Sequence, residues 1–246
     1  MEEKSDHDAG AEAAAIATAT ESRKRKRAAN RRLRKDKKSN VELTEEMFEN
    51  LPYKRPDFAM EDARALTAQL GYMPYNIIDV AARNVSGRPI VALLYGLTRE
   101  KTCDGVSTKP LKPFPTIYWL TCPNLKSDIS KLEDAGWITK LQDRLNSDPA
   151  HIAAMQRAHE QYSEERRSNL SPEDLTFLEN NKSLHEYHTY GVAGMKSTSF
   201  RCVKCLHCHY AHFMGNPDHG NIIGKWVSEL LSGEVKAETA ICPRVC

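Results

Sequence analysis

The sequence predicts an α+β fold, in which a small antiparallel sheet of about three strands is covered by helices and the C-terminal half is helical. Two observations carry this prediction. Short apolar runs rich in β-branched residues fall between residues 77 and 121, and a Ser-Gly turn separates the first two. After residue 121, apolar residues recur every three or four positions, as they do along one face of a helix.

The expected strands lie in the first half of the chain. Residues 77–83 and 89–95 flank an Asn84-Val-Ser-Gly87 turn, which predicts a hairpin. Residues 116–121 form a third run, and the Gly-, Pro- and Lys-containing residues 96–115 before it predict a loop. We expect the three strands to be neighbours, because short strands joined by a tight turn gain most by pairing locally.

Helical spacing predicts the remaining elements. Apolar residues line one side of residues 61–70, and Gly71 ends that helix. Ser171-Pro-Glu-Asp174 is a capping sequence with Pro at the first helical position, and it opens a short helix to residue 178. Residues 180–200 are expected to form a loop. The other expected helices cover residues 124–135, 138–145, 149–168, the Cys/His segment at 205–212, and residues 221–231.

Composition separates a tail from a single domain. Residues 1–40 contain Ala, Thr, acidic and then basic residues with almost no bulky apolar side chains, which is typical of disorder. Residues 41–60 hold one short amphipathic piece that docks on the domain or serves as a linker. We therefore expect residues 1–60 to be a disordered basic tail and linker, and residues 61–246 to form one α+β domain.

The formal net charge of +2 conceals an uneven distribution. Residues 23–38 hold 11 basic residues and one acid, which leaves 24 basic against 32 acidic residues elsewhere, so no specific nucleic-acid groove is expected in the domain. Two basic clusters predict a bipartite nuclear localisation signal that binds an import receptor, or else an arm that binds polyanions. The residues of these clusters are Arg23, Lys24, Arg25, Lys26, Arg27, Arg34, Lys35, Lys37 and Lys38.

The cysteines indicate a reducing compartment. The chain has 7 Cys, no secretory signal at its start and no apolar run of 18 residues. We therefore expect an intracellular protein with free or metal-bound thiols and no membrane span, and the basic clusters favour the nucleus over the cytoplasm.

The segment between residues 205 and 212 gathers five side chains that can bind a metal: Cys205, His207, Cys208, His209 and His212. On a regular helix four of them share one sector and His207 points to the opposite side. Further ligands must come from Cys122 in a Cys-Pro turn or from the C-terminal Cys242 and Cys246. A structural or redox thiol cluster, or a nucleophilic Cys/His pair, remains an alternative to a metal site.

Several motifs resemble a known family. Trp119-Leu-Thr-Cys-Pro123 and Val203-Lys-Cys-Leu-His207 are the most specific, and Leu132-Glu-Asp-Ala-Gly136 also fits. Over about residues 66–246 the chain resembles the bacterial domain of unknown function 501 family, with an added basic N-terminal tail. The resemblance implies no established activity. It implies that Cys122, Cys205, His207 and His212 belong to the family pattern, whereas Cys208 and His209 do not.

Three functions remain in view. The first is a metal-binding domain, in which Cys122, Cys205, His212 and either His207 or Cys242 hold zinc; three ligands and a water would permit hydrolysis. The second is a Cys/His or metal-dependent hydrolase of a small phosphate-type anion, held by basic residues that otherwise make ordinary salt bridges. The third is a noncatalytic nuclear interaction module that uses the basic tail. The candidate anion-binding residues are Arg83, Arg166, Arg201 and Lys204.

Overall fold

The computed structural model describes residues 42–98, 112–181 and 184–233. The basic clusters at residues 23–38 and the candidate ligand Cys242 lie outside the described residues.

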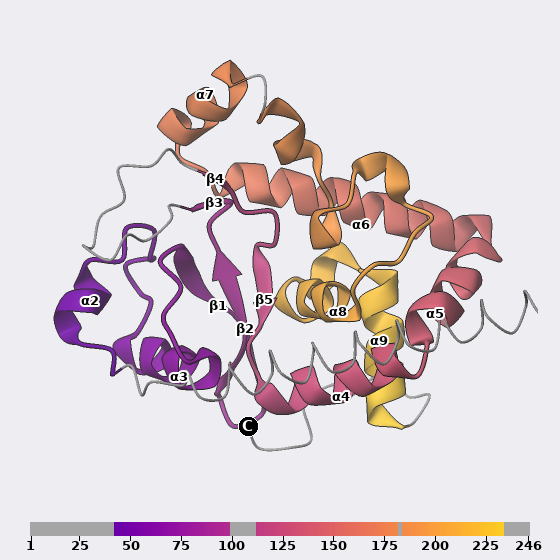
Figure 1. The fold of residues 1–246 in the computed structure, drawn as a ribbon, viewed down its shortest axis with the longest axis horizontal. Coiled ribbons are helices and arrows are strands. Elements are labelled where there is room, and N and C mark those ends of the chain that lie inside the picture. Colours follow the sequence, from indigo (N-terminus) through magenta and orange to yellow (C-terminus); the bar gives the residue numbers. More distant parts are fainter. Residues whose placement is uncertain (1–41, 99–111, 182–183, 234–246) are drawn as a thin grey trace, which may run out of the picture. The chain divides into compact units, whose positions relative to one another are not determined.

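A three-stranded antiparallel sheet with the order β1-β2-β5 forms the centre of the described part (Figure 1). Its strands are β1 (Ile77–Arg83), β2 (Pro89–Leu94) and β5 (Tyr118–Leu120), at the three places where the sequence predicts strands. All residues of the central strand β2 are buried. The antiparallel α+β prediction is therefore confirmed. In the region expected to be a loop, β3 (Leu97–Thr98) and β4 (Lys112–Pro113) form a second, two-stranded sheet.

One face of the sheet is covered by residues that precede it in the chain. α2 (Glu45–Glu49) and α3 (Met60–Leu70) contribute Phe48 and Leu66, which pack in one cluster with Ala92 and Leu94 of β2. Residues 42–60 therefore belong to the domain and are not a linker. The segment packs on the sheet because it is rich in apolar residues, and Leu43, Leu51 and Phe58 are buried in the same cluster.

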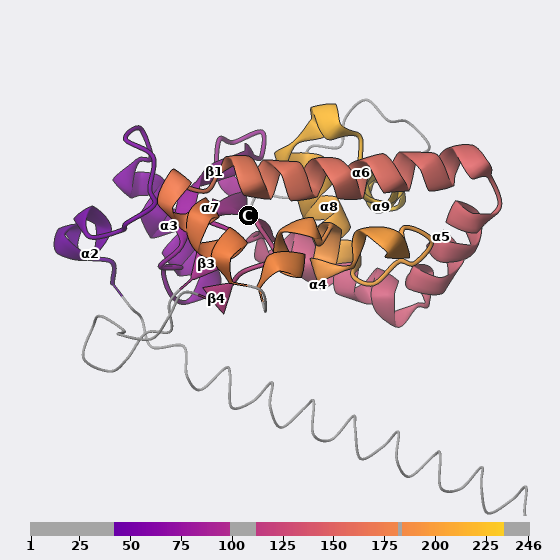
Figure 2. The ribbon, with the colours of Figure 1, turned by 90° about the horizontal axis from the view of Figure 1, so that it is seen from above.

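Helices cover the other face. α8 (Leu206–Gly215) lies against the sheet with α9 (Ile222–Ser232) behind it, as Figures 1 and 2 show. Gly224 permits this close approach, because a Cβ there would overlap the backbone carbonyl of His209. None of the helices within the described ranges is long and apolar enough to cross a membrane. The other helices are α4 (Pro123–Asp134), α5 (Trp137–Asn146), α6 (Pro149–Ser168), α7 (Pro172–Asn180), η1 (His185–Thr189), η2 (Val192–Gly194), η3 (Ser197–Ser199) and η4 (Pro217–His219).

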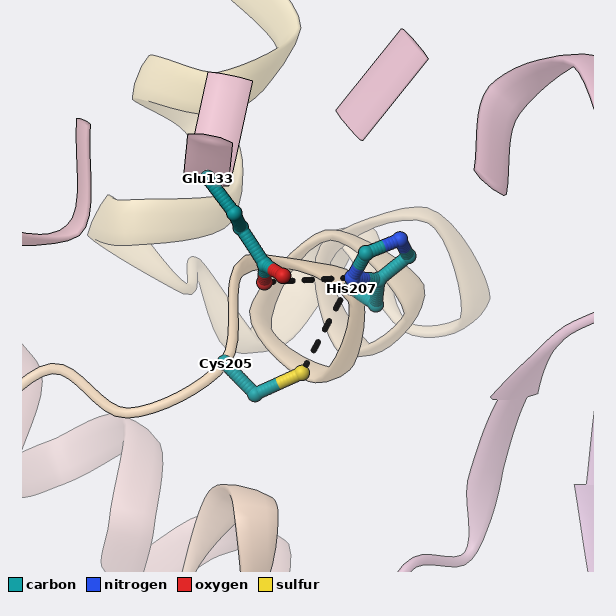
Figure 3. Close-up of side chains that lie close together, drawn as sticks. All are labelled: Glu133, Cys205 and His207. Carbon is teal, nitrogen blue, oxygen red and sulfur yellow. Dashed lines mark hydrogen bonds and ion pairs between the residues drawn. The ribbon is translucent and has the colours of Figure 1, made fainter. Parts of the chain in front are cut away.

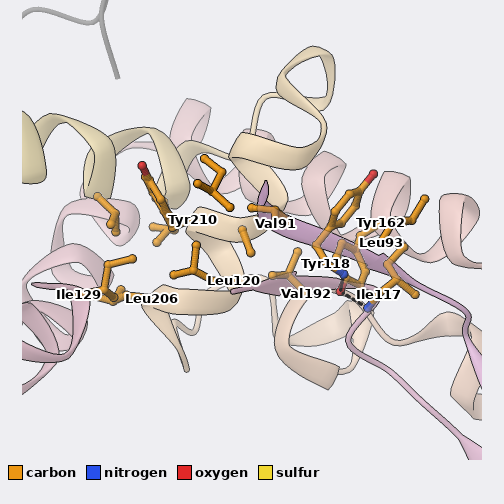
Figure 4. Packing of buried hydrophobic residues seen from close by; sticks show 14 of the residues in the cluster. Val91, Leu93, Ile117, Tyr118, Leu120, Ile129, Tyr162, Val192, Leu206 and Tyr210 are labelled. Atoms are coloured by element: carbon orange, nitrogen blue, oxygen red, sulfur yellow. Dashed lines mark hydrogen bonds between the residues drawn. The ribbon is translucent and has the colours of Figure 1, made fainter. Parts of the chain in front are cut away.

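The larger apolar cluster fills the space between the sheet and these helices (Figure 4). Val91 and Leu93 enter it from the β2 face opposite to Ala92 and Leu94, as the two-residue period of a strand requires. Tyr162 of α6 is fully buried in it, and its hydroxyl oxygen accepts a hydrogen bond of 2.8 Å from the backbone N–H of Ile117. This bond ties α6 to the chain entering β5, and so fixes the helical layer on the sheet.

Candidate metal centre

The last turn of α4 meets the start of α8, and three side chains with metal-binding atoms converge there (Figure 3). They are Glu133 from α4, Cys205 at the N-cap of α8 and His207 in its first turn. One ligand atom of each lies within 4.8 Å of the other two. Among the side chains that the structure describes, no other group of three Cys, His, Asp or Glu residues meets in this way.

The backbone of Cys205 explains why it can face His207. Its φ of −141° and ψ of 115° are extended, so α8 begins at Leu206 and Cys205 precedes it. On a regular helix two residues separated by one other point in nearly opposite directions, whereas here Cys205 turns back across the helix start. The Leu206 N–H donates a 2.8 Å hydrogen bond to Glu133 Oε1. The negative carboxylate therefore also interacts favourably with the positive, N-terminal end of the α8 dipole.

The ring of His207 is held from both sides. Its Nε2 lies 3.0 Å from the carbonyl oxygen of Lys126, while its Nδ1 lies 3.1 Å from Glu133 Oε1 and 3.9 Å from Cys205 Sγ. A carbonyl oxygen can only accept, so Nε2 carries a hydrogen and donates it. In a neutral ring the Nδ1 lone pair then points at the carboxylate and the sulfur. Three groups with lone pairs facing one another need a proton or a metal ion among them, and the proton can lie on Nδ1, on the sulfur or on the carboxylate.

The pKa values reflect this crowding of opposite charges. Burial lowers the pKa of His207, but the Cys205 sulfur and the Glu133 carboxylate raise it more, to about 10. Burial raises the pKa of Glu133, but His207 lowers it more, and the net pKa is below the ordinary value. The pKa of Cys205 is lowered, chiefly by a hydrogen bond from the Cys208 thiol and further by His207. Without metal, neutral pH therefore favours an imidazolium between a thiolate and a carboxylate.

The structure brings two of the five predicted metal ligands together, Cys205 and His207. Cys122 is fully buried at the N-cap of α4 and is disulfide-bonded, so its sulfur is not an available ligand in this state. His212 lies in the last turn of α8, where its ring stacks on Tyr118 and Nδ1 lies 3.1 Å from the amide nitrogen of Asn221. Cys242 is outside the described residues.

The histidines near His212 form a separate, interior group. His159 and His209 have no solvent exposure, and their ring centroids are 6.2 Å apart. Nδ1 of His159 accepts a 3.0 Å hydrogen bond from the Val192 N–H, which keeps that nitrogen unprotonated. A Cβ on Gly191 would overlap the His159 ring, so this position requires glycine. Burial lowers the pKa of His159 to about 4 and that of His209 to about 3.

The candidate anion-binding residues divide into two pairs. Arg83 forms an ion pair with Asp62, and the guanidinium of the buried Arg166 donates to backbone carbonyls, those of Pro115, Tyr187 and Tyr190. Both guanidinium groups thus have structural partners. Arg201 and Lys204 are exposed on the segment that leads into Cys205. These two cations lie close to Cys205 in the sequence.

Sequence reasoning missed Glu133 as a member of the cluster. It is separated from His207 by 74 positions, so no local spacing connects them. Glu133 lies in Leu132-Glu-Asp-Ala-Gly136, one of the motifs that resemble the family, and this position was the only sign in the sequence of a special role. An acid in a motif at the end of a helix, with no apolar role to fill, is a candidate for a tertiary contact.

Fold and site together define an α+β domain with a Glu/Cys/His cluster where two helices meet. The model of a family described as protein of unknown function (DUF501) matches residues 80–229, and the chain belongs to that family. No curated protein and no solved structure matches the chain. The family membership predicted from the motifs is thereby confirmed. Because the family has no established function, the function has to be inferred from the site.

Proposed function

We propose that this protein binds one zinc ion through Glu133, Cys205 and His207. The observation that supports it is the convergence of a carboxylate oxygen, a sulfur and a ring nitrogen on one point. The opposite ring nitrogen of His207 donates to the Lys126 carbonyl, which is the support that metal-binding histidines usually have. Oxygen, nitrogen and sulfur together suit Zn²⁺, which binds all three.

The distances are close to those of a tetrahedral site. Bond lengths of about 2.0–2.3 Å to zinc place neighbouring ligand atoms about 3.3–3.7 Å apart. The Nδ1–Oε1 distance is 3.1 Å and the Nδ1–Sγ distance is 3.9 Å. Small side-chain movements would therefore bring these atoms to zinc-binding distances, with the His207 ring already held by the Lys126 carbonyl oxygen.

Three protein ligands define an open site. A zinc ion held in this way keeps a position for water and lowers its pKa, which is the basis of metal-assisted hydrolysis. Arg201 and Lys204 are exposed close to Cys205 along the chain and supply positive charge on the solvent side. A small anion of the phosphate type is therefore the substrate class that we assign to an activity at this site.

Metal analysis of the full-length protein, purified without chelator, tests the proposal. We expect about one zinc per chain in the wild type and less than about 0.2 in Glu133→Gln, Cys205→Ser and His207→Gln. A wild-type protein with less than about 0.2 zinc would refute the proposal, and so would three variants that retain zinc like the wild type.

Each ligand variant has a matched control. Asp134→Asn changes the exposed acid next to Glu133, and Cys202→Ser removes an exposed free thiol three positions before Cys205. His151→Gln changes a partly exposed histidine on α6. All three controls should bind zinc like the wild type, because none of these side chains belongs to the cluster.

A second candidate, a cysteine nucleophile that works without metal, is favoured by the lowered pKa of Cys205 and the raised pKa of His207. Alkylation of the metal-free protein at different pH values, followed at the Cys205 peptide by mass spectrometry, tests it. The thiolate reading predicts fast alkylation well below the ordinary thiol pKa, and slower alkylation in His207→Gln. An apparent pKa near about 8.5 in the wild type would show no activation.

A further inference from the structure

Cys208 has no place in the proposed metal site, although it lies one helical turn from Cys205. It is the third residue of α8, and Cys205 is the N-cap. Both thiols are free, and the Cys208 thiol donates a hydrogen bond to the Cys205 sulfur. The structure therefore contains a Cys-x-x-Cys pair in direct contact at the N-terminus of a 10-residue helix.

The positions of the two residues favour a bond between them. The N-cap and the third helical residue are the pair that reach each other in a capping box, because the N-cap backbone is extended and turns its side chain over the first turn. Cβ atoms three positions apart on a helix are about 5–6 Å apart, and a disulfide needs about 3.5–4.5 Å. The backbone of Cys205 is extended, so its Cβ does not keep the helical spacing from Cys208, and α8 itself begins only at Leu206.

We propose that Cys205 and Cys208 form a reversible disulfide, and that this disulfide removes Cys205 from the metal site. The first part depends only on the two thiols. The second part rests on the proposed zinc site, since a sulfur in a disulfide is no longer a thiolate ligand. The pair would make metal binding at Glu133 and His207 dependent on the redox state of the surroundings.

The reaction needs a two-electron oxidant, and a low-molecular-weight disulfide such as glutathione disulfide is the class that we assign. The Cys205 thiolate attacks one sulfur of that disulfide, whose S–S bond breaks and releases the first thiol with a proton from solvent. The Cys208 thiol loses its proton to solvent, and its sulfur attacks Cys205. The mixed disulfide breaks and the second thiol leaves. Two thiols of the protein are thus oxidised and one disulfide is reduced to two thiols.

Tryptic mapping of the full-length protein tests this directly. Reduced, metal-free protein is exposed to glutathione disulfide, alkylated and cleaved. Cleavage after Arg201 and Lys204 leaves Cys205 and Cys208 on one peptide and Cys202 on another. We expect the first peptide to escape alkylation at both cysteines and to be two hydrogens lighter. Alkylation at both cysteines, or a link to the Cys202 peptide, would overturn the inference.

Variants separate the two steps of the reaction. Cys208→Ser should stop at the mixed disulfide, so that one glutathione stays on Cys205, and Cys208→Ala repeats the test should serine destabilise the fold. Cys202→Ser should oxidise like the wild type. If Cys208→Ser does not retain glutathione on Cys205, the assignment of Cys205 as the attacking thiol is wrong.

The coupling to metal is measured on zinc-loaded protein with a colorimetric chelator. Oxidation should release the zinc in the wild type and in Cys202→Ser, and reduction should restore binding. Zinc that stays bound while the disulfide forms would refute the coupling. A protein that forms the disulfide but never binds zinc would refute the proposed function and leave the dithiol pair standing. The two failures are therefore distinguishable.

Discussion

Acid should destabilise this domain through its two buried histidines, His159 and His209. Their pKa values in the folded protein are about 4 and about 3, whereas an unfolded chain has a histidine pKa near 6.5. Between these values the unfolded state binds more protons, so the free energy of unfolding falls as the pH falls. The free energy of unfolding that the two neutral rings contribute is fully present above about pH 6.5. It is lost progressively as the pH falls from there towards the two folded-state pKa values.

The size of the effect follows from the shifts. Each histidine costs about 1.4 kcal/mol per pH unit in this range, so two residues over the two units from pH 6.5 to 4.5 cost about 5 kcal/mol. This equals the whole stability of many domains. Both side chains are fully buried, so solvent screening reduces the cost little. The neighbouring His159 ring contributes further to the lowered pKa of His209.

Urea unfolding followed by circular dichroism from pH 7.5 to 4.5, with chelator present throughout, measures this slope. His159→Gln and His209→Gln should each flatten it by about 1.4 kcal/mol per pH unit, although both variants lose stability at pH 7.5. His151→Gln, the same exchange at a partly exposed site on α6, serves as the control for the exchange itself. Equal slopes in all four proteins would refute the reasoning.

Four other predictions concern the site, the packing and the tail. Zinc binding at pH 7.5 should release about one proton, measured by calorimetry in two buffers, because His207 with its raised pKa must free Nδ1. Gly191→Ala should cost about 1–3 kcal/mol in thermal melts, because the new Cβ overlaps His159. Arg166→Met should cost about 3 kcal/mol or more in urea unfolding, because buried carbonyls lose their donor. We propose that residues 23–38 direct nuclear import, so residues 1–40 fused to a fluorescent protein should concentrate it in the nucleus.

Each of these has an outcome that contradicts it. Zinc-binding heats that are the same in both buffers, before any correction for buffer ionisation, would mean that no proton leaves. Gly191→Ala should lower the stability much less when His159 is already alanine, because the overlapping ring is gone. If the stability losses of the two single variants simply add in the double variant, the overlap with His159 is not the cause. An Arg166→Met protein as stable as the wild type would contradict the structural role of Arg166, and anion binding would again be a candidate role for it. A fusion that stays nuclear after its basic clusters become alanine would contradict import by these residues.

The strands and most helices could be predicted because their signals are local. Residues 77–83 coincide with β1, and Gly71 and Gly136 stand where two predicted helices end, since turns and caps depend on neighbouring residues. The domain border was missed because the burial of Phe48 depends on the sheet face that it covers, which lies over forty residues further along. Composition alone could not show that contact.

The site was half predictable for the same reason. Cys205 and His207 stand out by residue type, but Glu133 joins them only through the packing of α4 against α8. His212 was grouped with Cys205 by helical spacing, yet seven residues of helix separate two side chains by about 10 Å along the axis. The structure instead buries His212 against aromatic rings of β5 and α6.

The family match begins at residue 80, inside β1, whereas the folding unit begins near residue 42. A chain shortened to the matched region would keep β2 and lose the cover over Ala92 and Leu94. An open apolar sheet face of this kind promotes aggregation, so such a fragment should be insoluble even with Glu133, Cys205 and His207 all present. A soluble form of this domain therefore has to include residues 42–79, which lie outside the family match.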